Sequence, residues 1–127
     1  MLRLKSTVVF DTNMILRYIL EDNIEMADIA EEYIMSCNVI VTIEVIAEVV
    51  YVLRKVYSME RQSVVDNVQK FTKLVYCEED DVLNLALDTY SNNNLDFVDC
   101  ILYAYNKIEG YEIATFDKKL LRLLNGT

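Results

Sequence analysis

The chain has 127 residues, a formal net charge of −9 and 54% hydrophobic residues, a composition typical of one soluble globular domain. It contains no histidine, which excludes Ser-His and Cys-His nucleophile pairs, imidazole acid–base catalysis and histidine-ligated zinc. No apolar run reaches bilayer length, the start lacks the apolar core of a signal peptide, and the three cysteines are widely spaced. We therefore expect a cytoplasmic protein that does not bind a membrane.

The same composition limits the chemistry that this chain can perform. Without histidine, an enzyme must rely on carboxylates, Lys, Tyr, Ser, Thr or a bound metal ion. Proteins that hold nucleic acid through their overall field are normally basic. A nucleic-acid role for this acidic chain would therefore need a local feature that overcomes repulsion.

The first half of the sequence predicts short strands that alternate with helices. Strands are expected at Ser6–Phe10, Asn38–Thr42 and Leu74–Cys77. Helices are expected at Thr12–Leu20, Ile24–Met35, Ile43–Tyr57 and Met59–Lys73, the last with Ser58 as its N-cap. The acids of Ile24–Met35 are expected to form a solvated outer face.

The pattern continues in the second half. Helices are expected from Glu78 to about Tyr90, at Phe97–Glu109 with Gly110 as the closing residue, and at Lys118–Leu124. Ser91–Asn94 reads as a loop and Glu112–Thr115 as a fourth strand. Alternating strands and helices predict an α/β fold, a three-layer α/β/α sandwich with a central parallel sheet, formed by residues 1–127 as a single domain.

Acidic residues lie where the strands of this predicted sheet end. Asp11 follows the first strand and Asp117 follows the fourth, while Asp96 and Asp99 open the helix after the Asn-rich loop. Glu48 lies in the helix after the second strand, among apolar neighbours, so we expect its side chain to point partly inward. Sites in parallel α/β sheets form at the carboxyl ends of the strands, which would bring these acids together.

Each acid also has an ordinary structural explanation. Asp11, Asp96 and Asp117 are good N-cap residues, and Asp99 lies in a helical first turn, where acids are favoured. Four segments would bring carboxylates to one edge of the sheet, and these carboxylates would repel one another unless a cation is present. An all-oxygen cluster without His or Cys favours Mg²⁺ or Mn²⁺ over zinc. We therefore expect Asp11 to be a metal ligand.

Four segments in chain order resemble the PIN domain family, most closely its VapC-type toxins. They are "VVFDTNMILRYIL", "IAEVVYVL", "LDFVDCILYA" and "IATFDKKL". By this resemblance Asp11, Glu48, Asp99 and Asp117 match the family's acids, and Asp96 is an accessory acid. All five would serve as metal ligands, with Asn13 and Thr115 as supporting polar residues. The Pro that often precedes the second acid is absent.

The resemblance implies a Mg²⁺- or Mn²⁺-dependent ribonuclease, often dimeric and held inactive by a cognate antitoxin. Metal bound to the acids would lower the pKa of a water molecule and neutralise a phosphate oxygen, so phosphodiester cleavage needs no histidine. Candidate contacts to the RNA phosphates are Arg17, Arg54, Lys55, Lys118, Lys119 and Arg122. The apolar stripes of Ile43–Val56 and Ile101–Tyr105 suggest a homodimer that also binds a basic antitoxin segment.

Other functions stay open at this point. A PIN-fold RNA-processing nuclease would lack an antitoxin, and a degenerate PIN fold could serve only as an interaction module. A receiver-like Mg²⁺-binding signalling domain needs paired acids after the first strand, where this chain has Asp11 alone. A haloacid-dehalogenase-type phosphatase needs an Asp two residues after the first, where this chain has Asn13.

Overall fold

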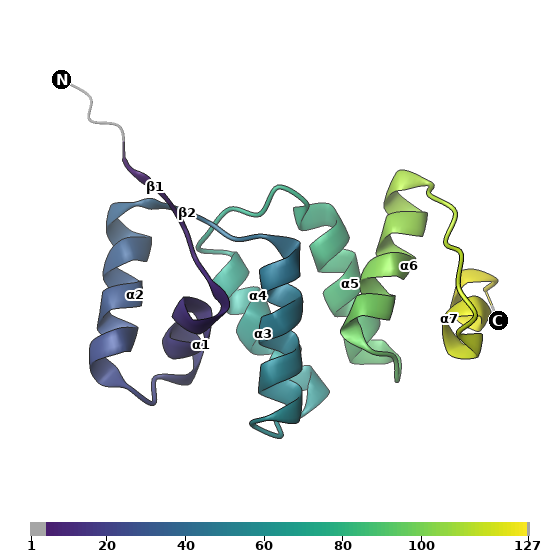
Figure 1. Ribbon diagram of the computed structural model, residues 1–127, viewed down its shortest axis with the longest axis horizontal. Coiled ribbons are helices and arrows are strands. Elements are labelled where there is room, and N and C mark those ends of the chain that lie inside the picture. Colours follow the sequence, from purple (N-terminus) through teal and green to yellow (C-terminus); the bar gives the residue numbers. More distant parts are fainter. Residues whose placement is uncertain (1–4, 127) are drawn as a thin grey trace. The chain divides into compact units, whose positions relative to one another are not determined.

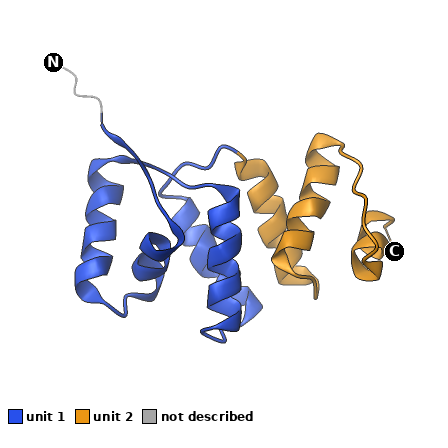
Figure 2. Cartoon of the chain, viewed as in Figure 1, with its two compact units in different colours: residues 1–78 blue, residues 79–127 orange. Residues whose placement is uncertain are grey.

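The computed structural model describes residues 5–126, which divide into two compact units, unit 1 up to Glu78 and unit 2 from Glu79 onward (Figure 2). Unit 1 contains β1 (Thr7–Val9), α1 (Thr12–Leu20), α2 (Ile24–Ser36), β2 (Asn38–Ile40), α3 (Ile43–Lys55) and α4 (Arg61–Thr72) (Figure 1). Unit 2 contains α5 (Asp80–Asn92), α6 (Phe97–Glu109) and α7 (Lys118–Leu124). The predicted α/β class with a parallel sheet is confirmed.

The sheet of unit 1 is short and parallel. β1 pairs with β2 in the register Thr7↔Asn38, Val8↔Val39 and Val9↔Ile40. The predicted third strand is reduced to one parallel bridge between Ile40 and Tyr76. Two backbone hydrogen bonds hold it, from the Tyr76 N–H to Val39 O at 2.9 Å and from the Val41 N–H to Tyr76 O at 2.9 Å.

The core of unit 1 forms around the residue that ends the first strand. Phe10 is buried, stacks on Phe71 of α4 with ring centroids 6.3 Å apart, and meets Tyr33 of α2 edge-on at 6.1 Å. Offset and edge-to-face ring pairs of this kind add stability beyond the burial of their area. The packing fixes the chain one residue before Asp11.

The apolar stripe of α3 is internal to unit 1. Its buried side chains are Ile43, Ile46, Val49, Val50 and Leu53. The interpretation of Ile43–Val56 as exposed surface for a partner is therefore wrong for most of that stripe. Within Ile101–Tyr105, Ile101 and Ala104 are likewise buried in unit 2. Both stripes are apolar because they fill cores.

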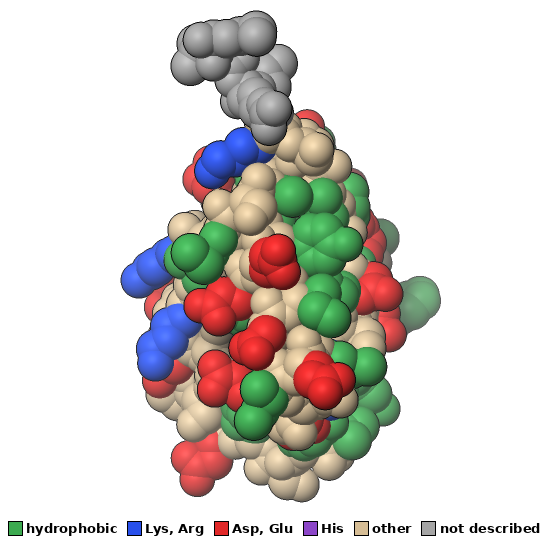
Figure 3. Space-filling model, turned by 90° about the vertical axis from the view of Figure 1, so that its left-hand side faces the viewer, with side chains coloured by type: hydrophobic (Ala, Val, Ile, Leu, Met, Phe, Trp, Pro, Cys, Tyr) green, Lys and Arg blue, Asp and Glu red, His purple; other side chains and the backbone are tan. Residues whose placement is uncertain are grey.

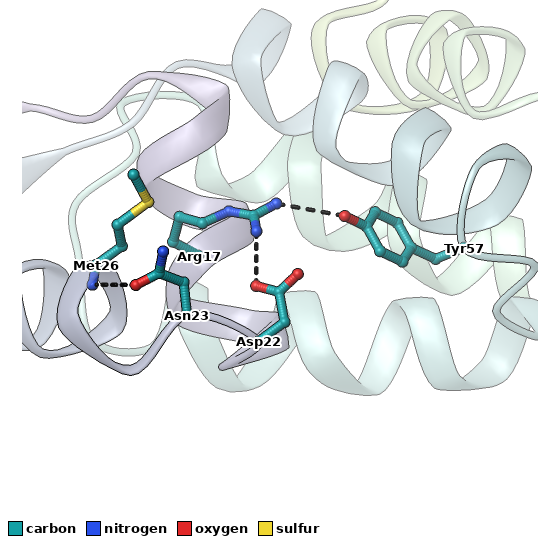
Figure 4. A network of polar contacts seen from close by, with 5 residues as sticks. All are labelled: Arg17, Asp22, Asn23, Met26 and Tyr57. Atoms are coloured by element: carbon teal, nitrogen blue, oxygen red, sulfur yellow. Dashed lines mark hydrogen bonds and ion pairs between the residues drawn. The ribbon is translucent and has the colours of Figure 1, made fainter.

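Arg17 of α1 is held by two neighbours, which Figure 4 shows in close-up. Its guanidinium donates to Asp22 Oδ1 at 2.6 Å and to the Tyr57 hydroxyl at 3.3 Å. The hydrogen bond to Tyr57, followed by the charge of Asp22, raises the pKa of Arg17. Next to this pair, Asn23 caps α2 by accepting from the Met26 N–H at 3.1 Å. Arg17 thus has a structural role, and we no longer expect it to contact phosphate.

Ser58 lies between α3 and α4 and begins neither helix, so its prediction as an N-cap is wrong. Its φ of 54° lies in the left-handed region, and the Met59 N–H bonds to the Leu53 carbonyl, six residues back, at 3.0 Å. A residue in this left-handed conformation turns the chain away from the helical path. α4 begins later, with Glu60 at its N-cap.

Unit 2 is built on the pairing of α5 with α6. Tyr90 and Phe97 meet edge-on with ring centroids 5.5 Å apart, and the Tyr105 hydroxyl donates to the Glu79 carboxylate. α6 has the predicted ends, and Gly110 closes it with a φ of 74°, a conformation that glycine adopts without strain.

The predicted fourth strand, Glu112–Thr115, is not assigned as a strand in the described part of the chain. A strand requires a ladder of backbone partners. Side chains bind the backbone around this segment instead: Asn106 Nδ2 donates to Tyr111 O at 2.8 Å, and the Asp117 N–H donates to Thr115 Oγ1 at 3.0 Å. α7 then begins at the predicted residue, Lys118.

Burial along α3 predicts that truncating a side chain lowers stability strongly on one side of the helix and hardly at all on the other. Leu53→Ala removes a fully buried side chain of unit 1 and should lower the free energy of unfolding by about 2–5 kcal/mol. Tyr51→Ala, on the exposed side of the same helix, should change it by no more than about 0.5 kcal/mol. Urea unfolding followed by circular dichroism measures both. Equal destabilisation by the two variants would contradict this assignment of the α3 core.

Candidate metal centre

Asp11 connects the first strand to the first helix. It is the N-cap of α1, and its Oδ1 accepts a hydrogen bond from the Met14 N–H at 2.9 Å. This bond satisfies one of the unpaired N–H groups of the first turn. This capping bond involves only Oδ1 of Asp11, so Oδ2 takes no part in it. The side chain is exposed, so the carboxylate is not buried as the apolar strand before it suggested.

Glu48 lies close to Asp11 through one intervening residue. Its Oε2 accepts a hydrogen bond from Thr12 Oγ1 at 2.9 Å, and Thr12 directly follows Asp11. Contrary to expectation, Glu48 is exposed, because the buried face of α3 runs through Ile46, Val49 and Val50 instead. Sequence reasoning missed Thr12; its position beside Asp11 was the available signal. Asn13, named as a supporting residue, is exposed in the first turn of α1.

The other three acids belong to unit 2. Asp96 is the N-cap residue of α6 but makes no side-chain capping bond, and Asp99 lies partly buried in the first turn. Asp117 caps α7 by accepting from the Leu120 N–H at 2.8 Å through Oδ1. Thr115 positions Asp117 by accepting its backbone N–H. The capping explanation thus holds for Asp117 and fails for Asp96.

The acids of unit 2 act on one another electrostatically. The pKa of Asp99 is raised, first by partial burial, then by the charge of Asp117 and then by that of Asp96. Burial and neighbouring negative charge both disfavour the ionised carboxylate. Asp96 lies three residues before Asp99 in the sequence and Asp117 lies eighteen residues after it, so the fold of this unit concentrates negative charge at Asp99.

This donor set suits a hard divalent cation. Its donor groups are carboxylates, which match the preference of Mg²⁺ and Mn²⁺ for oxygen ligands. A cation would relieve the repulsion that raises the pKa of Asp99. Among residues 5–126, no three or more Asp, Glu, Cys or His side chains are grouped closely enough to hold a metal ion as they stand. The fit therefore rests on the chemistry of the donors.

The basic residues predicted to contact phosphate fall into two groups. Arg17 is held by Asp22 and Tyr57, and Arg54 donates to the Met59 carbonyl at 3.2 Å. The rest have exposed side chains: Lys55, Lys118, Lys119 and Arg122. Three of these four lie on α7, directly after Asp117.

A family model described as the PIN domain matches residues 8–124. The chain belongs to the PIN domain family. No curated protein matches the sequence. PIN domains are generally nucleases that use Mg²⁺ or Mn²⁺, so the family supports a hydrolase acting on nucleic acid and favours this interpretation over the receiver-like and phosphatase alternatives. No helix within residues 5–126 is long and apolar enough to cross a bilayer.

Asp99 offers a direct test of the repulsion in unit 2. Because its folded-state pKa is raised, the native chain binds a proton here more readily than the unfolded chain does. The associated stability is present at low pH and is lost as pH rises through the raised pKa. Asp99→Asn removes the charge, so the variant should be at least as stable as the parent near neutral pH without metal, and the difference should vanish in acid.

Thermal melts of the parent and Asp99→Asn across this pH range, with and without Mn²⁺, measure the effect. Mn²⁺ should raise the melting temperature of the parent much more than that of the variant, because a ligand stabilises the state that binds it. A variant that melts lower at neutral pH yet gains as much from Mn²⁺ would identify Asp99 as a structural residue only.

Proposed function

We propose that this PIN domain is a Mg²⁺- or Mn²⁺-dependent endoribonuclease and the toxin of a type II toxin–antitoxin pair. The observation that carries the proposal is the negative charge concentrated at Asp99 in a chain without histidine. Residues 1–127 would act as one domain, and the acids that match the family's acids would serve one metal centre. Three free cysteines agree with the reducing cytoplasm in which we place the protein.

The catalytic set is Asp11, Glu48, Asp99 and Asp117, with Asp96 as a further metal ligand. When bound, the metal would supply a water of lowered pKa and a positive charge for the phosphate. The protein itself orients the carboxylates that would bind the metal. The bonds from the Met14 N–H, Thr12 and the Leu120 N–H each engage one oxygen of a catalytic carboxylate. Such bonds hold the ligands in place before substrate arrives.

Substitutions of Asp11 can distinguish a role as metal ligand from a role as helix cap. Asn caps helices about as well as Asp, whereas Ala does not. Asp11→Asn should therefore keep the stability of the parent, and Asp11→Ala should lose about 0.5–2 kcal/mol. Both variants should lose cleavage of a structured RNA in Mg²⁺ or Mn²⁺.

Gel analysis of RNA cleavage and urea unfolding of the same samples test this prediction. The parent should cleave in either metal and stop when excess EDTA is added. Undiminished cleavage in EDTA would exclude the metal mechanism, and full activity of Asp11→Asn would remove Asp11 from the site.

The α2 face supports the proposed antitoxin partner. Figure 3 shows acidic and hydrophobic side chains together on this side of the molecule. The exposed apolar residues of α2 are Ile24, Met26, Ile29, Tyr33 and Met35, and its acids are Glu25, Asp28, Glu31 and Glu32. Exposed apolar side chains set among carboxylates match an amphipathic segment rich in Arg and Lys. We propose this face as the contact for a basic antitoxin segment.

The homodimer also remains a proposal, although the stripes first assigned to it are largely buried. Exposed apolar side chains available to a second copy include Tyr51 and Val56 in unit 1 and Val98 and Ile108 in unit 2. A strictly monomeric mass at micromolar concentration would contradict the dimer. A PIN nuclease that processes RNA without an antitoxin is the alternative to the toxin role.

Expression in bacteria tests the toxin role. The parent should arrest growth, Asp99→Asn should not, and co-expression of the protein from the adjacent reading frame should restore growth. Ile29→Lys places a positive charge on the α2 face and should weaken this rescue while RNA cleavage stays unchanged. Lys70→Glu, on the exposed side of α4, is the control for a changed surface charge and should leave rescue intact. Growth that is unaffected by the active parent would favour the processing nuclease.

A further inference from the structure

A cleft within unit 2 combines positive charge with amide groups. It has a volume of about 250 Å³ and is lined by Asn93, Asn94, Leu95, Lys119, Arg122 and Leu123. This volume lies below the roughly 300–1,000 Å³ of sites that enclose drug-sized ligands. The cleft is therefore sized for one small group, such as a phosphate with part of its sugar.

The charge of this cleft is unusual for the protein. Among residues 5–126, its lining contains two cationic side chains and no carboxylate side chain, in a chain with a net charge of −9. Two clefts beside α2 show the opposite pattern. The lining of one includes Glu32 and that of the other Glu21, Asp28 and Glu31, and no cationic side chain of the described residues lines either. An anion would thus favour the unit 2 cleft over these two.

The loop wall of the cleft is held by its own side chains. Asn93 Nδ2 donates to Thr89 O at 3.0 Å, and Asn92 Nδ2 donates to Asp88 O at 2.9 Å, so both amides cap the end of α5. Asn94 is exposed, and its amide can donate to an anion. A loop fixed in this way loses little conformational freedom when a ligand binds.

The cleft adjoins the proposed catalytic acids in the chain. Leu95 directly precedes Asp96, and Lys119 lies two residues after Asp117. Consecutive Cα atoms are about 3.8 Å apart, so each wall of the cleft lies within one nucleotide length of a site acid. An RNA strand cleaved at the acids could therefore place a neighbouring phosphate in the cleft.

Phe116 adds a second feature that fits a nucleic acid. Its ring is fully exposed, directly before Asp117. The backbone here is fixed by the Thr115–Asp117 hydrogen bond and by the Asp117 cap of α7. An exposed aromatic ring on a fixed backbone offers a stacking surface for an unpaired base, and such surfaces accompany cationic grooves in proteins that bind single strands.

We propose that the cleft lined by Asn94, Lys119 and Arg122 binds a backbone phosphate of single-stranded RNA, and that Phe116 stacks on a base of the same strand. This inference rests on the proposed ribonuclease function and assigns two contacts with its substrate, one to a phosphate and one to a base. It also explains how an acidic protein holds RNA beside its carboxylates, since cations and a ring lie next to them on unit 2.

The test is binding of a short fluorescent unstructured RNA by the full chain in EDTA, followed by anisotropy from about 50 to 200 mM KCl. The double variant Lys119→Gln/Arg122→Gln should bind more weakly. Its plot of log K against log salt should be less steep by about 0.7, because the cleft contacts one phosphate and each phosphate contact to a single strand contributes about 0.7. The control Lys70→Gln/Lys73→Gln, which removes the same charge from exposed positions of unit 1, should keep the parent slope.

Phe116 is tested in the same assay. Phe116→Ala should weaken binding roughly 5- to 150-fold, as expected for loss of one stacked base. Phe116→Tyr should restore binding because it keeps the ring, and Phe116→Leu should not. Equal binding by the Tyr and Leu variants would overturn the stacking role.

Cleavage in Mg²⁺ is measured on the same RNA, so that failure of this inference can be told apart from failure of the proposed function. The cleft variant should raise KM and leave kcat nearly unchanged. A parent that cleaves while the cleft and control variants share one salt slope would overturn the phosphate site and leave the ribonuclease intact. A parent that binds but does not cleave would overturn the ribonuclease function, and a parent that binds no RNA in EDTA would overturn the inference.

Discussion

Repulsion among carboxylates is the constraint on which the chemistry of this protein depends. The fold of unit 2 sets Asp99 in a partly buried position under the influence of Asp117 and Asp96, which raises its pKa. Evolution of a stable fold alone would not favour such crowding, because it costs stability at neutral pH. A divalent cation would turn the same arrangement into a favourable one, and PIN domains, the family to which this chain belongs, are generally nucleases that use such a cation.

Unit 1 shows how the same residues can serve folding and chemistry. Phe10 anchors the end of the first strand in an aromatic core, and Asp11 follows as a helix cap. Thr12 then joins this helix start to Glu48 on α3. Hydrogen bonds from the Met14 N–H and from Thr12 thus hold the carboxylates of Asp11 and Glu48, while the packing of Phe10 holds the chain just before Asp11.

Local patterns in the sequence predicted the elements that depend on local interactions. α1, α6 and α7 have the predicted ends, because Asp11, Gly110 and Asp117 are helix-end residues whose effect lies within one turn. Features that depend on distant partners were missed. The strand predicted at Glu112–Thr115 lacks a ladder, and the apolar stripe of α3 is buried by packing that no local pattern reveals. The exposure of Glu48 was missed for the same reason.

Our central proposal is that Asp11 and Asp99 bind the same metal ion, and a double-mutant cycle on Mn²⁺ affinity tests this most directly. Titration calorimetry would compare the parent, Asp11→Asn, Asp99→Asn and the double variant. Ligands of one centre should be strongly coupled, so the double variant should lose much less affinity than the sum of the two single losses. Independent losses that add, or an Asp11→Asn variant that binds Mn²⁺ as the parent does, would contradict a shared centre.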